Sequence, residues 1–140
     1  MINWGIIGLG NIANSFAEAI GEINDCQLKG IASLNKSKLS IFGEKYNIDK
    51  KYRFNSYDEL INSDQIDAIY VATLNNTHKD LIIKSIDAKK NILCEKPITI
   101  NDQEIKDVYK KIKDSKICIL NILSFLAFSD ADSKQLCEIN

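Results

Sequence analysis

Short runs of apolar residues alternate with longer stretches of mixed polar and apolar residues along most of the chain. The apolar runs are rich in β-branched side chains, as expected of buried strands. The pattern predicts strands at Ile2–Ile7, 27–33, 52–54, 65–73, Asn91–Cys94 and 116–123. The stretches between them predict helices at 11–23, 36–46, after Ser56, 77–89 and 101–113. Ser56 and Glu59 have the spacing of a capping box for the short helix between the third and fourth strands.

The order of these elements indicates the fold class. Strands alternate with helices, and the strands are solid apolar runs, which is typical of a parallel sheet covered on both faces. Crossovers between such strands are nearly always right-handed. We therefore expect an α/β fold, a doubly wound parallel sheet, over residues 1–123. Residues 124–140 have no obvious place in this pattern.

Composition restricts the classes of function. The 140 residues carry a net charge of -1, with 45% hydrophobic and 26% charged residues, which is ordinary for a soluble globular protein. Arg53 is the only arginine and the lysines alternate with acids, so we expect no nucleic-acid partner. The apolar run 117–128 is broken by Asn121 and Ser124 and is shorter than the roughly 20 residues that span a membrane. No targeting signal precedes the first strand, and we expect a cytoplasmic protein without a membrane partner.

Cysteine and histidine usage predicts no metal site. The cysteines show no C-x-x-C spacing, and His78 is the only histidine. In a cytoplasmic chain we expect the cysteines to be buried, reduced thiols. They are Cys26, Cys94, Cys118 and Cys137.

A glycine-rich turn joins the first strand to the first helix. Gly8, Gly10 and Ala13 form a G-x-G-x-x-A pattern. The first glycine permits a tight turn, the second lets a pyrophosphate approach the backbone, and the small third residue lets the helix pack close to the strand. The pattern predicts that Gly8, Gly10, Asn11 and Ile12 bind a dinucleotide at the start of the helix.

The end of the second strand carries no acidic residue. Ser33, Leu34 and Asn35 stand where an Asp or Glu would bind the adenosine ribose of NAD. The absence of a carboxylate, with Lys36 and Lys38 nearby, favours NADP and leaves NAD open. Alternatively, the two lysines are ordinary solvated residues in the first turn of the next helix, an interpretation that the sequence favours for Lys36.

A lysine and the only proline of the chain follow the fifth strand. In a parallel sheet, ligands bind beyond the carboxyl ends of the strands, so Lys96 belongs on the same side as Gly8. There it can donate or accept a proton, or place a fixed positive charge beside a substrate oxygen. Pro97 restricts Lys96 to extended geometry and makes a cis peptide bond accessible.

Three stretches in this order resemble the nucleotide-binding half of the GFO/IDH/MocA family, which includes glucose-fructose oxidoreductase and inositol dehydrogenase. They are "INWGIIGLGNIA", "VATLNNTH" and "DAKKNILCEKPI", and the resemblance runs from about residue 2 to residue 122. It implies a Rossmann domain that binds NAD or NADP, with Lys96 as a catalytic lysine close to the nicotinamide and the substrate.

The resemblance also implies roles for further residues. Thr73, Leu74, Asn75 and His78 match the family's T-P-N-x-x-H loop on the nicotinamide side, with Leu74 in place of proline. Glu95, beside Lys96, is expected to contact the nicotinamide ribose, or else to form a local ion pair. Alternatively, His78 is a residue at the start of the helix whose side chain is hydrogen-bonded within the protein. Leu34 stands where many members carry an arginine for the 2'-phosphate, which weakens the case for NADP.

Family members are typically more than twice this long. The resemblance implies a second α/β domain that binds the substrate, so we expect residues 124–140 to be the remnant of the connection to it. The apolar segment 122–128 would then be exposed and could drive formation of a homo-oligomer.

The function expected from these features is the nucleotide-binding domain of an NAD(P)-dependent oxidoreductase. The complete enzyme would act by hydride transfer on a sugar, a cyclitol or a related alcohol or carbonyl, and a small-molecule substrate would bind only with the second domain. A truncated, catalytically incompetent dinucleotide-binding or sensor module is the first alternative. A structural oligomerisation subunit is the second.

Overall fold

The computed structural model of the chain describes residues 1–113 and 115–121. The predicted remnant at 124–140 and the apolar segment 122–128 lie outside the described residues. The strands are β1 (Ile2–Ile7), β2 (Cys26–Ala32), β3 (Arg53–Phe54), β4 (Ala68–Val71), β5 (Asn91–Cys94) and β6 (Ile119–Asn121). The α-helices are α1 (Asn11–Gly21), α2 (Lys36–Lys45), α3 (Tyr57–Ile61), α4 (His78–Asp87) and α5 (Asp102–Lys113). Two 3₁₀ turns, η1 (Lys50–Tyr52) and η2 (Asn75–Thr77), complete the described elements.

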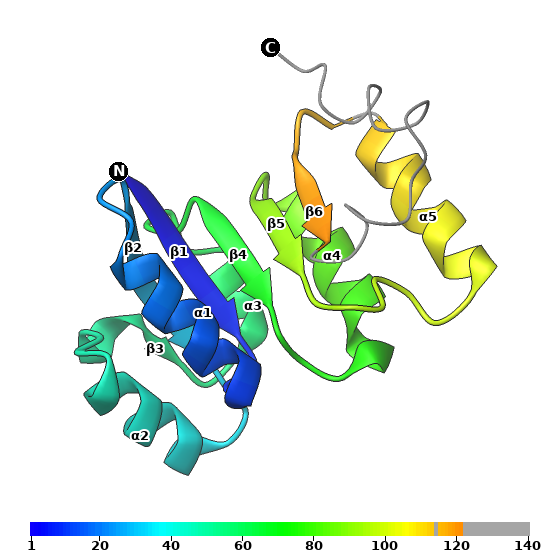
Figure 1. Cartoon of the computed structure of the whole chain (residues 1–140). Coiled ribbons are helices and arrows are strands. Elements are labelled where there is room, and N and C mark those ends of the chain that lie inside the picture. The colour runs from blue at the N-terminus through cyan, green and yellow to red at the C-terminus, as the bar shows by residue number, and fades with distance from the viewer. Residues whose placement is uncertain (114, 122–140) are drawn as a thin grey trace.

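The strands form one parallel sheet in the order β3-β2-β1-β4-β5-β6 (Figure 1). This is the strand order of a doubly wound Rossmann fold, and it confirms the fold class predicted from the sequence. The chain winds outward from β1 to β3 and then crosses to β4 on the other side of β1. The order therefore reverses between β1 and β4.

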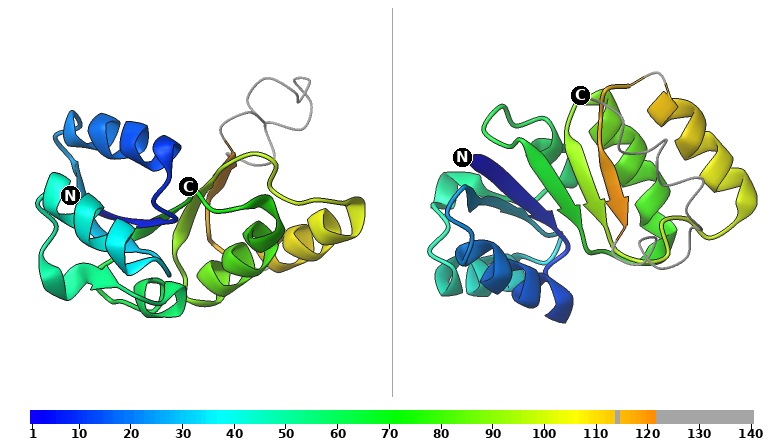
Figure 2. Two further views of the ribbon diagram at one scale, coloured as in Figure 1. Left: turned by 90° about the horizontal axis from the view of Figure 1, so that it is seen from below. Right: turned by 45° about the horizontal axis from the view of Figure 1, so that its top comes forward.

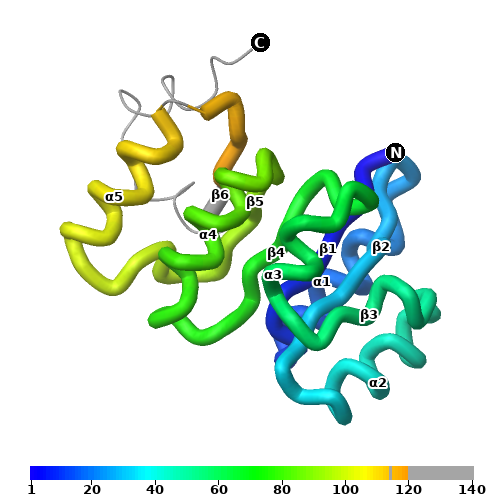
Figure 3. The backbone as a smooth tube through the Cα atoms, turned by 180° about the vertical axis from the view of Figure 1, so that it is seen from behind, coloured from blue at the N-terminus to red at the C-terminus, as the bar shows by residue number. Residues whose placement is uncertain are grey.

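Helices cover both faces of the sheet (Figure 2). Helices α1 and α2 lie on one face, and α3, α4 and α5 lie on the other, which Figure 3 shows from behind. Each strand contributes to both layers because successive side chains point to opposite faces. In β1, Ile6 packs in the cluster under α1 and α2, whereas Ile7 packs in the cluster under α3, α4 and α5. In β4, Tyr70 belongs to the first cluster, and Ile69 and Val71 belong to the second.

Several element boundaries differ from those expected. β4 begins at Ala68 rather than 65, because the preceding residues form a turn in which the Ile66 N–H donates to the Ser63 carbonyl. β6 begins at Ile119 rather than 116, and α1 ends at Gly21 rather than 23. The predicted capping box is wrong: Ser56 is the N-cap of α3, but its side chain makes no capping hydrogen bond.

The prediction of buried thiols holds for one of the three cysteines described. Cys94 is buried, whereas Cys26 is half-buried and Cys118 is exposed just before the edge strand β6. Burial raises the pKa of the Cys94 thiol to about 12, and the nearby Glu95 carboxylate adds to the shift. Cys137 lies outside the described residues. In residues 1–113 and 115–121, no helix is both long and apolar enough to cross a membrane.

The packing of α4 against the sheet is open to a direct test. Ile82 is 0% exposed in the cluster between α4 and the sheet, so Ile82→Ala removes buried methyl groups and leaves a cavity. We expect a loss of about 2–5 kcal/mol in the free energy of unfolding, measured by urea denaturation. The control Ile41→Ala, at a position 67% exposed on α2, should change it by less than about 0.5 kcal/mol. Equal losses in the two variants would contradict this packing.

Candidate functional site

The candidate site is the edge of the sheet where the strands end. The register pairs Ile7 with Ala32 and with Val71, and it pairs Val71 with Cys94. They are the last residues of four neighbouring strands, and they lie in one row across the sheet. The site residues predicted from the sequence lie in the segments that directly follow these strand ends. The structure thus brings the predicted segments together along one rim, at the point where the strand order reverses.

Gly8 makes the turn from β1 toward α1. Its φ of +92° lies in the left-handed region, and a Cβ atom there would be 2.6 Å from the Ala72 carbonyl oxygen. The Gly8 N–H donates to the Ala32 carbonyl oxygen at 3.1 Å, and the Ala72 N–H donates to the Ile7 carbonyl oxygen at 2.8 Å. The turn is therefore held between β2 and β4 at a spacing that only glycine permits.

The start of α1 has the features of an anion site. Gly10 is the N-cap, the helix has no side-chain cap and no acidic residue in its first turn, and a Cβ atom at Gly10 would meet nothing within 4 Å. Asn11 and Ile12 follow as exposed residues of the first turn, whereas Ala13 is fully buried against the sheet. The first backbone amides of a helix lack partners within the helix, and the helix dipole favours a negative charge there. The residues present therefore fit the pyrophosphate of a dinucleotide.

The segment after β2 is organised around the start of α2. Ser33 is buried, and its Oγ accepts from the Asn35 N–H at 3.1 Å. Asn35 is the N-cap of α2, because its Oδ1 accepts from the Lys38 N–H at 3.0 Å. Leu34 is exposed. The carboxamide oxygen of Asn35 is thus committed to the helix, a structural role that the sequence analysis did not assign.

The loop from β4 to α4 is ordered by two threonines. The Thr77 hydroxyl donates to the Leu74 carbonyl oxygen at 2.7 Å, and the Thr73 and Thr77 Oγ1 atoms are 2.7 Å apart. Because the Thr77 hydrogen is used on Leu74, Thr73 is the donor in the second bond. Leu74 and Asn75 are exposed. The pair of threonines therefore stabilises the loop in which Leu74 stands in place of proline.

His78 lies beneath this rim. Its side chain is 0% exposed, with Nδ1 2.8 Å from the Pro97 carbonyl oxygen and Nε2 3.1 Å from the Thr73 carbonyl oxygen. A neutral imidazole carries one N–H, so it donates to one of these carbonyls, and an imidazolium would donate to both. The ring thereby connects the loop after β4 to the loop after β5. This is the satisfied helix residue considered from the sequence, and direct contact of His78 with a cofactor stays a prediction.

Glu95 continues the sheet by one residue. Its N–H donates to the Val71 carbonyl oxygen at 3.0 Å, and the Tyr70 hydroxyl donates to its Oε1. Burial raises the pKa of Tyr70, and the hydrogen bond to Glu95 and the charge of that carboxylate raise it further. The phenol is therefore a permanent donor at ordinary pH. Sequence reasoning missed Tyr70, because only the register of β4 against β5 places it beside Glu95.

Lys96 follows on the same rim. It is exposed, and the peptide bond to Pro97 is cis. Within residues 1–113 and 115–121, its ammonium makes no hydrogen bond or ion pair. A charged group presented in this way beyond β5 can contact a bound molecule.

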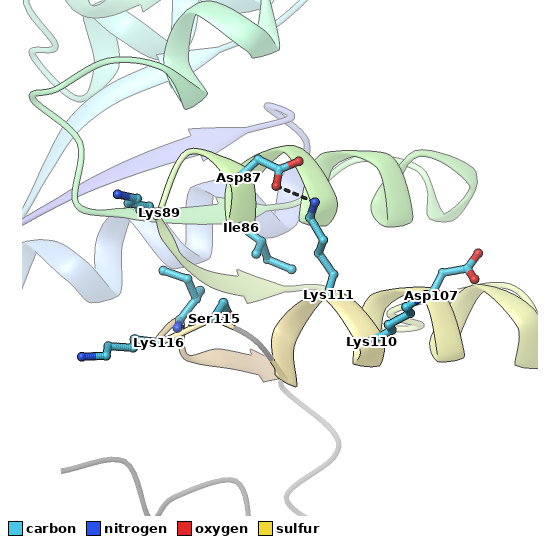
Figure 4. A pocket seen from close by; sticks show the side chains of 9 residues that line it. Ile86, Asp87, Lys89, Asp107, Lys110, Lys111, Ser115 and Lys116 are labelled. Carbon is cyan, nitrogen blue, oxygen red and sulfur yellow. Dashed lines mark hydrogen bonds and ion pairs between the residues drawn. The ribbon is translucent and has the colours of Figure 1, made fainter.

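The described part of the chain contains no group of three or more His, Cys, Asp or Glu residues that could hold a metal ion. A hollow of about 680 Å³ lies between the last turns of α4 and α5, where Lys111 pairs with Asp87 at 2.7 Å (Figure 4). This hollow adjoins the helix ends that lead into β5 and β6, at the opposite edge of the sheet from Gly8. It therefore does not belong to the candidate site.

Comparison with known proteins identifies the family and its fold. Residues 2–122 match the GFO_IDH_MocA family, described as an oxidoreductase family with an NAD-binding Rossmann fold. The chain is 36% identical over 107 residues to trans-1,2-dihydrobenzene-1,2-diol dehydrogenase of Xenopus tropicalis, covering 75% of this chain and 32% of that protein. It is 34% identical over 137 residues to myo-inositol 2-dehydrogenase of Thermotoga maritima, covering 96% of this chain and 39% of that protein.

A solved structure agrees with these relatives. The crystal structure of a probable dehydrogenase from Thermotoga maritima superposes with a TM-score of 0.81 at 29% identity, over 86% of this chain and 35% of that one. The chain thus spans about a third of the length of the curated relatives it matches.

The two glycines of the turn should respond differently to the same substitution. Gly8→Ala places a Cβ at a left-handed φ and against the Ala72 carbonyl, and we expect it to cost more than about 2 kcal/mol of unfolding free energy. In Gly10→Ala the added Cβ contacts nothing, so the variant loses only a favourable N-cap residue. We expect it to lower the free energy of unfolding by about 1 kcal/mol or less. Urea denaturation measures both. A Gly10→Ala variant that is as unstable as Gly8→Ala would refute the open cradle at the start of α1.

Proposed function

This chain belongs to the GFO/IDH/MocA oxidoreductase family, and on that premise we propose that residues 1–121 are the NAD(P)-binding part of an enzyme that oxidises or reduces a small polyol. The observation that carries the proposal is the row of aligned strand ends. It sets the uncapped start of α1, the segment after β2 and the Glu95–Lys96 segment on one rim. A dinucleotide needs a phosphate cradle between two nucleoside subsites. Along this rim, the start of α1 lies between the segment after β2 and the Glu95–Lys96 segment, as that arrangement requires.

The cofactor supplies hydride transfer at its nicotinamide ring. The residues of this chain would bind the phosphates through the amides at 10–12, and would place Lys96 beside the reacting oxygen of the substrate. A lysine at this position moves a proton to or from that oxygen, or stabilises negative charge on it. The exposed Lys96 ammonium, without a partner in the described residues, supports this assignment.

The class of substrate is proposed from the relatives. The two curated relatives are named for dehydrogenation of an inositol and of a dihydrobenzene diol, which are both rings with hydroxyl groups. We therefore infer a cyclic alcohol or the corresponding ketone. Because the chain matches about a third of those proteins, the groups that select the substrate are expected in a further domain. The domain boundary near residue 123, the cytoplasmic location and self-association through 122–128 stay predictions from the sequence.

The adenosine subsite bears on the choice between NAD and NADP. Ser33, Leu34 and Asn35 place no carboxylate after β2, so nothing in that segment repels a 2'-phosphate. Leu34 is exposed and offers no charge to bind one. Both cofactors are therefore compatible with this segment.

Dinucleotide binding is the first test. Titration calorimetry of the wild-type chain should show binding of NAD(H) or NADP(H), and Gly10→Val should abolish it, because the added side chain occupies the space beside the amides. Gly21→Val is a matched control at the far end of α1, where a Cβ also meets nothing within 4 Å, and it should bind as the wild type does. Failure of the wild-type chain to bind either dinucleotide at millimolar concentration would end the proposal.

The role of Lys96 is a separate test. Lys96→Ala should leave the fold unchanged and alter dinucleotide affinity by less than tenfold, because the side chain is exposed and lies outside the phosphate cradle. In a form of the enzyme that carries its substrate domain, the same change should reduce kcat by about a hundredfold or more, as expected for loss of a general acid or base. Steady-state kinetics measure this, with Lys89→Ala on the opposite edge of the sheet as the control. Wild-type turnover in Lys96→Ala would remove the catalytic assignment.

A further inference from the structure

The side chain of Asn14 connects the start of α1 to the end of α2. Its Nδ2 donates to the Gly10 carbonyl oxygen at 3.1 Å, and its Oδ1 accepts from Lys45 Nζ at 2.9 Å. The Tyr46 hydroxyl lies 2.9 Å from the same Oδ1. Because an ammonium can only donate, the carboxamide atom beside Lys45 is the oxygen, and the nitrogen is thereby directed to Gly10. The ammonium of Lys45 thus sets the orientation of the Asn14 carboxamide.

The bond to Gly10 acts on the first peptide group of the phosphate cradle. Gly10 is the N-cap of α1, and its peptide bond to Asn11 is trans. In a planar trans peptide the N–H points away from the carbonyl, so a carbonyl held toward Asn14 directs the Asn11 N–H away from the helix. Asn11 is exposed, and a Cβ atom at Gly10 would meet nothing within 4 Å. The Asn11 N–H therefore faces the open space proposed for the pyrophosphate.

These groups form a chain of hydrogen bonds that begins at an ammonium and ends at a backbone amide. Hydrogen bonds in a chain polarise one another, so a positive charge at one end makes the N–H at the other end a stronger donor. Glu18 also accepts from Lys45 Nζ, at 3.3 Å. It lies about one helical turn farther from the start of α1 than Asn14 does, so its carboxylate is more distant from the cradle. The chain therefore adds positive potential where an anion would bind.

We propose that Asn14 is a positioning residue that directs the Asn11 N–H to the phosphates of the dinucleotide and transmits to it the charge of Lys45. This inference rests on the proposed function. The G-x-G-x-x-A pattern assigns no role to Asn14 or Lys45. Asn14 acts through the Gly10–Asn11 peptide and does not itself touch the cofactor. Loss of its side chain should therefore affect ligands that carry phosphates and spare a ligand that has none.

ADP and adenosine separate a positioning role from a structural one, because they differ only in the pyrophosphate group. Both are titrated into the chain and followed by ¹H–¹⁵N NMR. Asn14→Ala should weaken ADP binding about fivefold, whereas adenosine binding should change by less than about twofold. At saturation with ADP, the Asn11 amide proton should move downfield in the wild type. In Asn14→Ala it should move by about half that distance or less, because its N–H is no longer directed and polarised.

A second variant tests the part played by Lys45. Lys45→Met should weaken ADP binding about threefold and leave adenosine binding unchanged. In the Asn14→Ala background it should have no further effect, because the charge reaches the cradle through Asn14. The Lys45 side chain is 50% exposed, so this variant keeps the fold and its selectivity carries the test if Asn14→Ala does not fold.

Asn62→Ala is the matched control. The Asn62 Nδ2 donates to the carbonyl oxygen of Asp58, four residues earlier, at 2.8 Å, which is the same kind of bond as that from Asn14 to Gly10. It lies at the end of α3, away from the cradle. This variant should bind ADP and adenosine as the wild type does.

The outcomes are distinct. Equal weakening of ADP and adenosine by Asn14→Ala would show a merely structural role and overturn the inference, as would unchanged ADP binding in that variant. A loss from Lys45→Met that is as large in the Asn14→Ala background as in the wild type would also overturn it, because the charge would then act without Asn14. Failure of the wild-type chain to bind ADP would instead refute the proposed function, and this inference with it.

Discussion

The close approach of Gly8 to the Ala72 carbonyl determines where the site can form. With a Cβ at residue 8, the turn after β1 would have to move away from the loop after β4, because the two would be 2.6 Å apart. Without that side chain, the turn accepts a left-handed φ and stays bonded to β2 through its own N–H. Helix α1 consequently begins directly over the strand ends, at the reversal of strand order. The absence of a side chain at residue 8 thus determines where helix α1 begins.

The rest of the rim is held by hydrogen bonds between loops. His78 connects the carbonyls of Thr73 and Pro97, and Tyr70 connects β4 to Glu95. Both side chains are buried, so these bonds lie in surroundings of low dielectric, where an unmade bond would be costly. The exposed side chains of Leu74 and Lys96 therefore stand on loops whose backbones are fixed from below. Such a frame presents exposed side chains on a main chain that is held in place.

The alternation of strands and helices was predictable from the hydrophobic pattern, and the bounds of β1 and β5 agree with it. The class of fold was predicted as well, and the parallel sheet with the order β3-β2-β1-β4-β5-β6 confirms it. The pattern could not supply what depends on three-dimensional register. Tyr70 is an ordinary strand residue in the sequence, and it meets Glu95 only because Tyr70 aligns with Leu93. Asn35 likewise was assigned only a ligand-binding role, which stays a prediction, and the capping of α2 by its oxygen was not foreseen. Ser56 had the right spacing for a capping box, but spacing does not fix the rotamer of its hydroxyl.

The rim is chemically asymmetric. The segment after β2 presents buried Ser33, exposed Leu34 and the capping Asn35, none of which carries a charge. The segment after β5 presents a carboxylate and an ammonium in succession, Glu95 and Lys96. A neutral subsite suits recognition of a nucleoside, because binding there requires shape and a few hydrogen bonds. A charged group is needed at the reacting end, because the transfer of a hydride from an alcohol requires that a proton also leave its oxygen, and the reverse reaction requires that one be supplied. On the proposed function, this asymmetry assigns the reacting end of a dinucleotide to the β5 side, where Tyr70 and His78 connect the loops.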